Sequence, residues 1–231
     1  MAITALQRDL LARLQANYTS GLTTVQASER RRGGGVNNVR PPLDCPKWVC
    51  CLLPCISSIS SMKQFRLVQP DDAEVLRDAS WIRYDHTSLV VGDVVRLVEG
   101  DVIPADCAVI SLGMDHVETT PVVDEESNDA KPGDELHFEL TVDSHLITGE
   151  CKPRQISTQS NGTAEAETLY YGSRVLEGAC IAVVTATGNR VVLAKLIKEG
   201  RWPPQTDLSE EATEIDRMEN EEAGIALSPI S

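Results

Sequence analysis

The sequence predicts a mainly β domain with helical segments at both ends. From Lys63 onward, short strand-like runs alternate with turn residues such as Gly, Pro, Asn and Asp. Before them, apolar residues recur at helical spacing over residues 3–17, and after them residues 190–199 show a helical pattern that Gly200 ends. The 231 residues are enough for one domain of ordinary size with additional tails.

The charge of the chain is unevenly distributed. The net charge of −14 argues against general nucleic-acid binding, which needs a basic face. Residues 1–66 carry nine Lys and Arg against three Asp and Glu, an excess of +6, so the remainder carries −20. The sequence has no run of about 18 apolar residues that would span a bilayer, and no secretory signal pattern. Seven cysteines in such a chain favour reduced thiols inside the cell.

Two helices are predicted near the N-terminus. The amphipathic pattern of residues 3–17 indicates a helix that either packs on its own domain or docks on a membrane or partner. Thr23 and Gln26 have the spacing of a capping box and begin the second helix, which residues 33–35 (GGG) end.

Four cysteines then fall within eleven residues: Cys45, Cys50, Cys51 and Cys55. Three interpretations remain open, namely a zinc site, reversible palmitoylation, and ordinary thiols. Paired Cys-x-x-Cys spacing is absent, which disfavours zinc, whereas neighbouring Trp, Leu and basic residues suit lipidation. Two acyl chains, or one with a basic patch, would give a stable anchor at a membrane surface.

Strand candidates follow, separated by turns and loops. A tight turn is expected at residues 78–80, an acidic inserted loop at 114–137 and a polar loop at 157–166. From Asp207 to the end there are eight acids and one Arg, which predicts a disordered or marginally helical tail. The expected strands are residues 64–68, 74–77, 81–84, 93–97, 106–112, 139–142, 168–171, 174–177 and 179–186.

The candidate catalytic stretch is residues 142–153 (VDSHLITGECKP). Gly149 lies between the Thr148 hydroxyl and the Glu150 carboxylate and lets the backbone turn, so that Glu150 points outward. An exposed carboxylate on a sharp turn between strands suits the positioning of a water molecule or general-base catalysis. The same tripeptide also occurs in ordinary turns.

This stretch stands in a series of further motifs. Residues 89–97 (LVVGDVVRL) and 99–106 (EGDVIPAD) precede it, and residues 171–178 (YGSRVLEG) and 183–188 (VVTATG) follow it. In this order the motifs resemble the actuator domain of the P-type ATPases, the cation pumps that form an aspartyl-phosphate. The resemblance covers about residues 64–200 and implies a distorted β-sandwich or jelly roll with flanking helices.

The resemblance also implies a role for each motif. Glu150 would orient the water that hydrolyses the aspartyl-phosphate, with Thr148 and Gly149 shaping the loop. Cys151 and Ile147 stand where the family usually has Ser and Leu, two modest departures. The Gly-Asp pairs at 92–93 and 100–101 are expected to shape turns and not to touch a substrate.

No phosphorylation motif, nucleotide-binding motif or ion-binding helix is found in these 231 residues. We therefore expect the chain to hold no cofactor and not to hydrolyse ATP alone; ATP and Mg²⁺ are implied only for a complete pump. The expected partners are the phosphorylation or membrane domain of such a pump, and the expected place is the cytoplasmic side of a membrane. The N-terminal order of Gly-Leu-Thr at residues 21–23, a short helix, Gly, Asn and Pro resembles the segment before the first membrane helix of cation pumps, and residues 214–217 (EIDR) resemble the lead-in to the third. Both resemblances favour the calcium or sodium/potassium branches over heavy-metal pumps.

The predicted organisation has three parts. Residues 1–62 form a helical and Cys-rich segment, residues 63–200 the β domain with its acidic insertion, and residues 201–231 an acidic tail. Two functions remain open: an actuator domain that acts in dephosphorylation, and a non-catalytic, lipid-anchored regulatory or scaffold protein that retains the fold.

Overall fold

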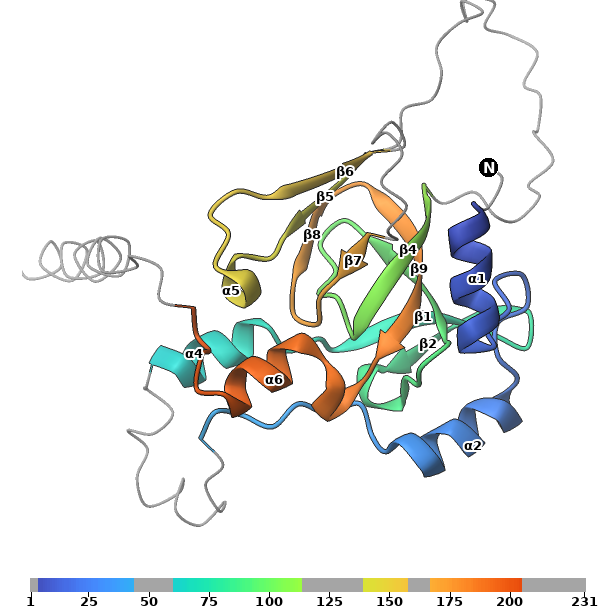
Figure 1. Ribbon diagram of the computed structural model, residues 1–231, viewed down its shortest axis with the longest axis horizontal. Helices are drawn as coiled ribbons and strands as arrows, with labels where there is room; N and C mark the ends of the chain where they lie inside the picture. The colour runs from blue at the N-terminus through green and yellow to red at the C-terminus, as the bar shows by residue number, and fades with distance from the viewer. Residues whose placement is uncertain (1–3, 44–59, 114–138, 158–166, 205–231) are drawn as a thin grey trace, which may run out of the picture.

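The computed structural model describes residues 4–43, 60–113, 139–157 and 167–204, and two antiparallel sheets form its centre (Figure 1). The larger sheet has the strand order β2-β1-β3-β9-β4-β7 and the smaller one β6-β5-β8. The predicted mainly β fold is confirmed. The strands are β1 (Asp72–Arg77), β2 (Ser80–Asp85), β3 (Val94–Val98), β4 (Asp106–Leu112), β5 (Glu139–Asp143), β6 (Arg154–Ser157), β7 (Thr168–Leu169), β8 (Arg174–Glu177) and β9 (Ala179–Ala186).

The helices lie around these sheets (Figure 1). Two short 3-10 segments, η2 (His86–Ser88) and η3 (Gly188–Arg190), join strands to their neighbours. The α-helices are α1 (Ala5–Leu14), α2 (Thr24–Gly34), α4 (Ser60–Leu67), α5 (His145–Thr148) and α6 (Val192–Lys198).

One predicted strand is wrong, because residues 64–68 belong mainly to helix α4. Phe65 in the helix and Val68 directly after it are both buried, whereas Leu67 is 61% exposed. Residues three apart lie on one side of a helix, so the burial of Phe65 and Val68 fits the helical period of 3.6 residues and not the strand period of two. The short sequence is compatible with both periods, and tertiary packing decides between them. Strand β6 was not predicted.

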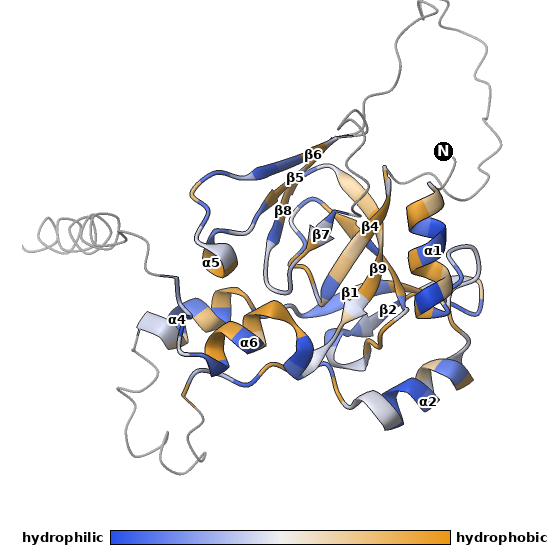
Figure 2. Cartoon of the chain, in the orientation of Figure 1, coloured by the Kyte–Doolittle hydropathy of each residue, from blue (hydrophilic) through white to orange (hydrophobic). Residues whose placement is uncertain are grey.

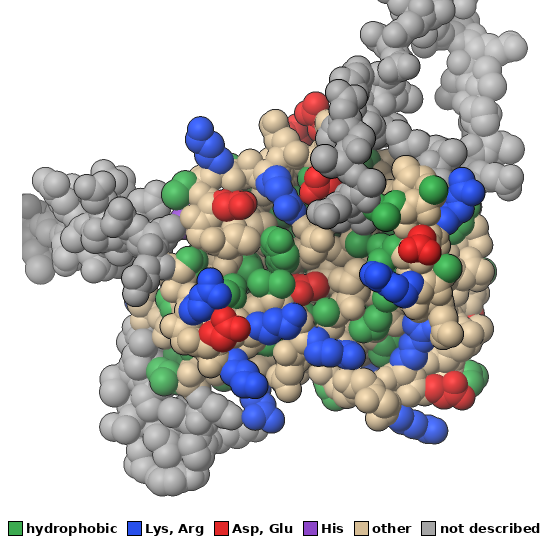
Figure 3. All heavy atoms as spheres, viewed as in Figure 1, with side chains coloured by type: hydrophobic (Ala, Val, Ile, Leu, Met, Phe, Trp, Pro, Cys, Tyr) green, Lys and Arg blue, Asp and Glu red, His purple; other side chains and the backbone are tan. Residues whose placement is uncertain are grey.

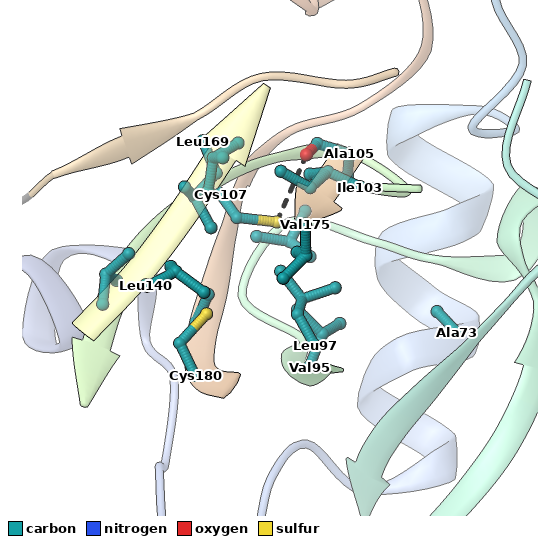
Figure 4. Close-up of a cluster of buried hydrophobic side chains, with 14 of the residues drawn as sticks. Ala73, Val95, Leu97, Ile103, Ala105, Cys107, Leu140, Leu169, Val175 and Cys180 are labelled. Atoms are coloured by element: carbon teal, nitrogen blue, oxygen red, sulfur yellow. Dashed lines mark hydrogen bonds between the residues drawn. The ribbon is translucent and has the colours of Figure 1, made fainter. Parts of the chain in front are cut away.

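The main hydrophobic core lies between the two sheets. Val95 and Cys107 from the larger sheet pack in one cluster with Leu140, Val142 and Val175 from the smaller one (Figure 4 labels most of this cluster). The chain passes from β8 in one sheet to β9 in the other at Gly178, whose φ is 87°. A Cβ on Gly178 would lie 2.1 Å from the Glu139 carbonyl oxygen, so only glycine fits this corner.

Strand β4 is buried on both faces. Cys107 and Val109 face the core between the sheets, whereas Ala108 and Ile110 pack against Leu11 of α1 on the other side. The structure therefore supports one of the two interpretations of the first helix, namely that it packs on its own domain. Figure 2 shows that β4 and β9 are hydrophobic, whereas α2 is largely hydrophilic.

Helix α2 begins as predicted. Thr23 is its N-cap, and the capping box with Gln26 is present. Arg30 of this helix donates hydrogen bonds to the carbonyls of Leu14 and Val91 at 2.9 and 2.7 Å. Because these carbonyls lie at the end of α1 and near the start of β3, Arg30 fixes both N-terminal helices to the sheet.

The Gly-Asp pair at 92–93 shapes a turn, as predicted, and also holds a buried ion pair. Asp93 is fully buried and accepts hydrogen bonds from the Arg77 side chain at 2.6 and 3.0 Å and from the Val90 N–H at 2.8 Å. Burial alone would lower the pKa of Arg77, but its hydrogen bonds and charge interaction with Asp93 raise that pKa above the usual value. The pair connects the end of β1 to the turn before β3.

Several predicted segments lie outside the described residues. They are the cysteine cluster (Cys45, Cys50, Cys51 and Cys55), the acidic loop 114–137, most of the polar loop 157–166 and the acidic tail from Asp207.

We predict that Arg77→Met destabilises the fold strongly. The substitution leaves the Asp93 carboxylate buried without its cation, and such loss typically costs about 3–5 kcal/mol. Urea unfolding followed by circular dichroism measures the change. Arg83→Met is the matched control, because the Arg83–Asp72 pair is exposed and spans 3.5 Å; exposed pairs contribute about 0–1 kcal/mol. Equal losses in both variants would contradict a special role for Arg77.

Candidate functional site

The stretch from residue 142 to 153 forms a strand end, one helical turn and an exposed loop. Strand β5 ends at Asp143, whose carboxylate accepts the His145 N–H at 2.8 Å, and Ser144 between them is the N-cap residue of α5. The helix ends at Gly149, with φ 79°, where the Gly149 N–H donates to the His145 carbonyl at 2.9 Å. The predicted turn at Gly149 is present, but a helical turn separates it from the strand.

Glu150 follows this glycine and is exposed, as is Thr148. The Thr148 hydroxyl donates to the Ser144 carbonyl at 3.1 Å and accepts the Glu150 N–H at 3.4 Å. The Glu150 carboxylate makes no hydrogen bond or ion pair with any residue that the structure describes. The backbone before Glu150 is therefore held in place, and its carboxylate remains available for a partner molecule.

A hydrophobic cluster lies beneath α5, and we call it the α5 cluster. Ile147, only 2% exposed, is its contribution from the candidate loop. The Trp202 indole N–H donates to the Leu146 carbonyl at 2.6 Å, and its ring meets Phe65 edge-on with centroids 6.1 Å apart. The buried members of the α5 cluster are Val39, Phe65, Val68, Ile147, Tyr171, Val191, Leu193 and Trp202.

The motif at residues 171–178 supports α5 from the other side. The Ser173 hydroxyl donates to the Ser144 hydroxyl at 3.0 Å, and both side chains are buried. Gly172 has φ 86°, and a Cβ there would lie 2.8 Å from the Val68 Cβ. The close approach of this turn to α4 therefore requires glycine.

Asp106 connects the sheet to this region. It is 5% exposed, and its carboxylate accepts the backbone N–H groups of Tyr171 at 2.9 Å and Val192 at 2.8 Å. Burial raises the pKa of Asp106 above its usual value, while the two hydrogen bonds act in the opposite direction. One side chain at the start of β4 thus positions both the 171–173 turn and the first turn of α6.

The sequence identified Thr148, Gly149 and Glu150, and the structure brings them together at the end of α5. Sequence reasoning missed the supporting residues Asp106, Ser144 and Trp202. Asp106 lay within a motif that we interpreted only as a family signature. Trp202 lies beyond every motif, and no sequence signal pointed to it.

No metal site or membrane span is found in the described ranges. Residues 4–43, 60–113, 139–157 and 167–204 hold no group of three or more His, Cys, Asp or Glu side chains that could bind a metal ion. Within the same ranges, no helix is long and apolar enough to cross a bilayer. A hollow of about 310 Å³ lies elsewhere, between α2 and η3, and Arg30 and Arg190 are among its lining residues.

The comparison with known protein families agrees with the fold and the candidate loop described above. Residues 67–126 and 133–200 match the model of the P-type ATPase actuator domain. This match covers more than half of the chain. The chain therefore belongs to the family of P-type ATPase actuator domains.

Individual relatives are cation pumps. The potassium-transporting ATPase alpha chain 2 of Rattus norvegicus is 29% identical over 177 residues, which are 74% of this chain and 14% of that protein. The sodium/potassium-transporting ATPase subunit alpha-3 of Homo sapiens is 27% identical over 138 residues, 58% of this chain and 11% of that protein. The chain thus corresponds to a small part of the length of these relatives.

Among solved structures, a zinc-transporting PIB-type ATPase in the E2.Pi state is similar to this chain. The TM-score is 0.41 and the sequence identity 17%, over 59% of this chain and 17% of the other.

We predict that Asp106→Asn destabilises the domain by about 1–3 kcal/mol, because an amide cannot accept both N–H groups. The pH dependence has a defined sign. The folded-state pKa is raised above the usual 3.8, so this group's contribution is full below that value and is lost as pH rises through the raised pKa. The deficit of the variant should therefore be larger at about pH 4 than at neutral pH.

Thermal unfolding at both pH values measures this difference. Asp72→Asn is the control, since Asp72 is exposed on β1 and should change stability little at either pH. A deficit that shrinks on acidification would contradict the assignment for Asp106.

We also predict that Cys151 is the reactive thiol among the three described cysteines, because it is exposed beside Glu150. Cys107 and Cys180 are buried, and burial raises the pKa of Cys180 to about 12. In a variant with Ser at positions 45, 50, 51 and 55, a disulfide reagent should label one thiol quickly and two only on unfolding. Raising the pH to about 9 should not release the two slow thiols.

Adding Cys151→Ser should abolish the fast reaction and leave the slow ones. Rapid labelling of two or more thiols in the folded protein would show that the core around β4 and β9 is more open than described.

Proposed function

We propose that this domain promotes hydrolysis of an aspartyl-phosphate, with Glu150 as the residue that orients and deprotonates the attacking water. The observation that carries the proposal is the exposed Glu150 carboxylate, which has no hydrogen-bond or ion-pair partner among the described residues and directly follows the hydrogen-bonded turn at Gly149. Family membership supports it, because the pumps of this family form such a phosphoenzyme.

The chemistry favours a carboxylate at a short distance from the phosphoryl group. Water attacks phosphorus, Glu150 takes one proton from that water, and the P–O bond to the aspartate breaks to give inorganic phosphate and a free aspartate carboxylate. Because a carboxylate repels the phosphoryl oxygens, Glu150 would contact the water and not the phosphate itself. An exposed position at the end of α5 permits this approach to another domain.

The supporting contacts explain how the loop could carry Glu150 without losing its geometry. Ile147 inserts into the α5 cluster, Trp202 holds the Leu146 carbonyl, and Ser173 holds Ser144. A catalytic group placed within a fraction of an ångström needs a rigid base of this kind. Thr148 and Gly149 would shape the loop and would not touch the reacting atoms.

The phosphorylated aspartate, ATP and Mg²⁺ would belong to a phosphorylation domain outside these residues, and a membrane domain would carry the cation. We further propose that the domain works at the cytoplasmic side of a membrane. The alternative function, a non-catalytic regulatory or scaffold protein, receives support from Cys151 in the place of the usual serine and from the cysteine cluster, a candidate for lipidation.

The first measurement is the apparent mass and membrane partition of the endogenous protein, with an antibody to residues 64–200. A large integral membrane band would place the domain within a complete pump. A band near 25 kDa that leaves the membrane after thioester cleavage would support the lipid-anchored alternative.

The decisive variant is Glu150→Gln. In the phosphoenzyme that contains this domain or binds it, we expect acyl-phosphate decay to slow by about 100-fold or more, the usual contribution of a general base. Glu177→Gln, an exposed carboxylate on β8, is the matched control and should leave the decay unchanged. Unchanged decay in Glu150→Gln would exclude the catalytic proposal and leave the scaffold alternative.

A further inference from the structure

One side of the domain is strongly basic although the protein as a whole is acidic. The described residues 30–43, 60–70 and 188–204 contain ten Lys and Arg and one acid, Glu199. The other described residues contain eight Lys and Arg against sixteen Asp and Glu. Positive charge is therefore concentrated in these three segments, and negative charge predominates in the other described residues.

These basic segments lie together along one edge of the molecule. Helices α2, α4 and α6 follow the lower edge in Figure 1, and Figure 3 shows Lys and Arg side chains gathered over this region. We define the basic face by the exposed side chains of Arg31 and Arg32 on α2, Lys63 and Arg66 on α4, and Lys195 and Lys198 on α6.

Aliphatic side chains are exposed within the same segments. Val36, Leu43 and Leu67 are 51%, 38% and 61% exposed. Single exposed apolar residues are normal on protein surfaces, and others lie outside these segments, so these three carry weight only together with the basic side chains around them. Basic side chains interspersed with exposed aliphatic ones are typical of surfaces that lie on membranes with anionic lipids. The aliphatic groups enter the interface while Lys and Arg meet the phosphates.

An apolar sequence connects two of the basic segments. The stretch with the four cysteines, Trp48, Leu52 and Leu53 lies between Leu43 and Ser60, the first residue of α4. The segment itself lies outside the described residues, and the basic face does not depend on its conformation.

We propose that the basic face binds the surface of a membrane that contains anionic phospholipids, independently of acylation. Nucleic acid would also present phosphates to the basic face, but it gives no role to the exposed aliphatic side chains. The acidic tail, which begins shortly after Pro204, has complementary charge but gives no role to the exposed aliphatic side chains. The proposal does not depend on the function of Glu150.

The test is co-sedimentation of the full chain, with Ser at positions 45, 50, 51 and 55, with vesicles. Vesicles of phosphatidylcholine alone are compared with vesicles that contain phosphatidylserine at about one third of the lipid, at low and high salt. We expect binding only to the phosphatidylserine vesicles, with loss at high salt because screening weakens the attraction.

The matched variants separate the basic face from net charge. Lys63→Gln, Arg66→Gln and Lys198→Gln together should weaken binding by about 100-fold, since each basic residue near an anionic surface contributes about fivefold. Arg13→Gln, Arg83→Gln and Arg174→Gln together change the net charge equally but lie on α1, β2 and β8, and should retain most of the binding. Circular dichroism verifies that both variants are folded.

Three results would overturn the proposal. They are no binding of the full chain to phosphatidylserine vesicles, equal losses in the two triple variants, and equal binding to phosphatidylcholine. If only a chain that ends at Pro204 binds, the acidic tail occupies the basic face and the membrane does not.

Discussion

The candidate site depends on the hydrogen bonds of one buried carboxylate. Asp106 stands at the start of β4 and accepts hydrogen bonds from the Tyr171 and Val192 N–H groups. Tyr171 is a buried member of the α5 cluster, and Val192 packs against it. Removing a carboxylate from water is unfavourable, as its raised pKa shows, and the two N–H groups offset part of that cost. Without the Asp106 carboxylate, the 171–173 turn and α6 would lose the side chain of β4 to which both are hydrogen-bonded.

Asp93 and Asp101 of the sequence motifs accept hydrogen bonds from groups of the chain itself. Asp93 accepts the Val90 N–H and the Arg77 guanidinium, and Asp101 accepts the Val98 N–H at 2.9 Å. Each carboxylate closes a turn that redirects the chain within or between the sheets. Glu99, Glu150 and Glu177 of the quoted motifs are exposed, and their carboxylates have no partner in the described part of the chain. Glu150 differs from the other two because it directly follows α5 and the left-handed Gly149 that ends this helix. This position after the Thr-Gly turn, and not exposure alone, makes Glu150 the candidate to act on a substrate.

The sequence predicted the mainly β class, the capping box at Thr23, strands β8 and β9 and the exposed position of Glu150, because local periodicity and turn chemistry determine these features. It failed where tertiary contacts decide. Residues 64–68 alternate like a strand, yet packing of Phe65 against Trp202 requires a helix there. Trp202 is 137 residues away from Phe65 along the chain, and no local pattern reports such a contact. The support of α5 was unpredictable for the same reason.

The basic face and the candidate loop share one set of buried contacts. Helices α4 and α6 carry Lys63, Arg66 and Lys198 outward, and the same helices place Phe65 and Leu193 into the α5 cluster beneath Ile147. A surface that held these helices against a membrane would therefore also fix the orientation of α5 relative to that membrane. Glu150 would then meet another domain from a constant direction, which reduces the rotational freedom lost when the two domains dock. If both proposals hold, the packing of the α5 cluster would couple membrane binding to the positioning of Glu150.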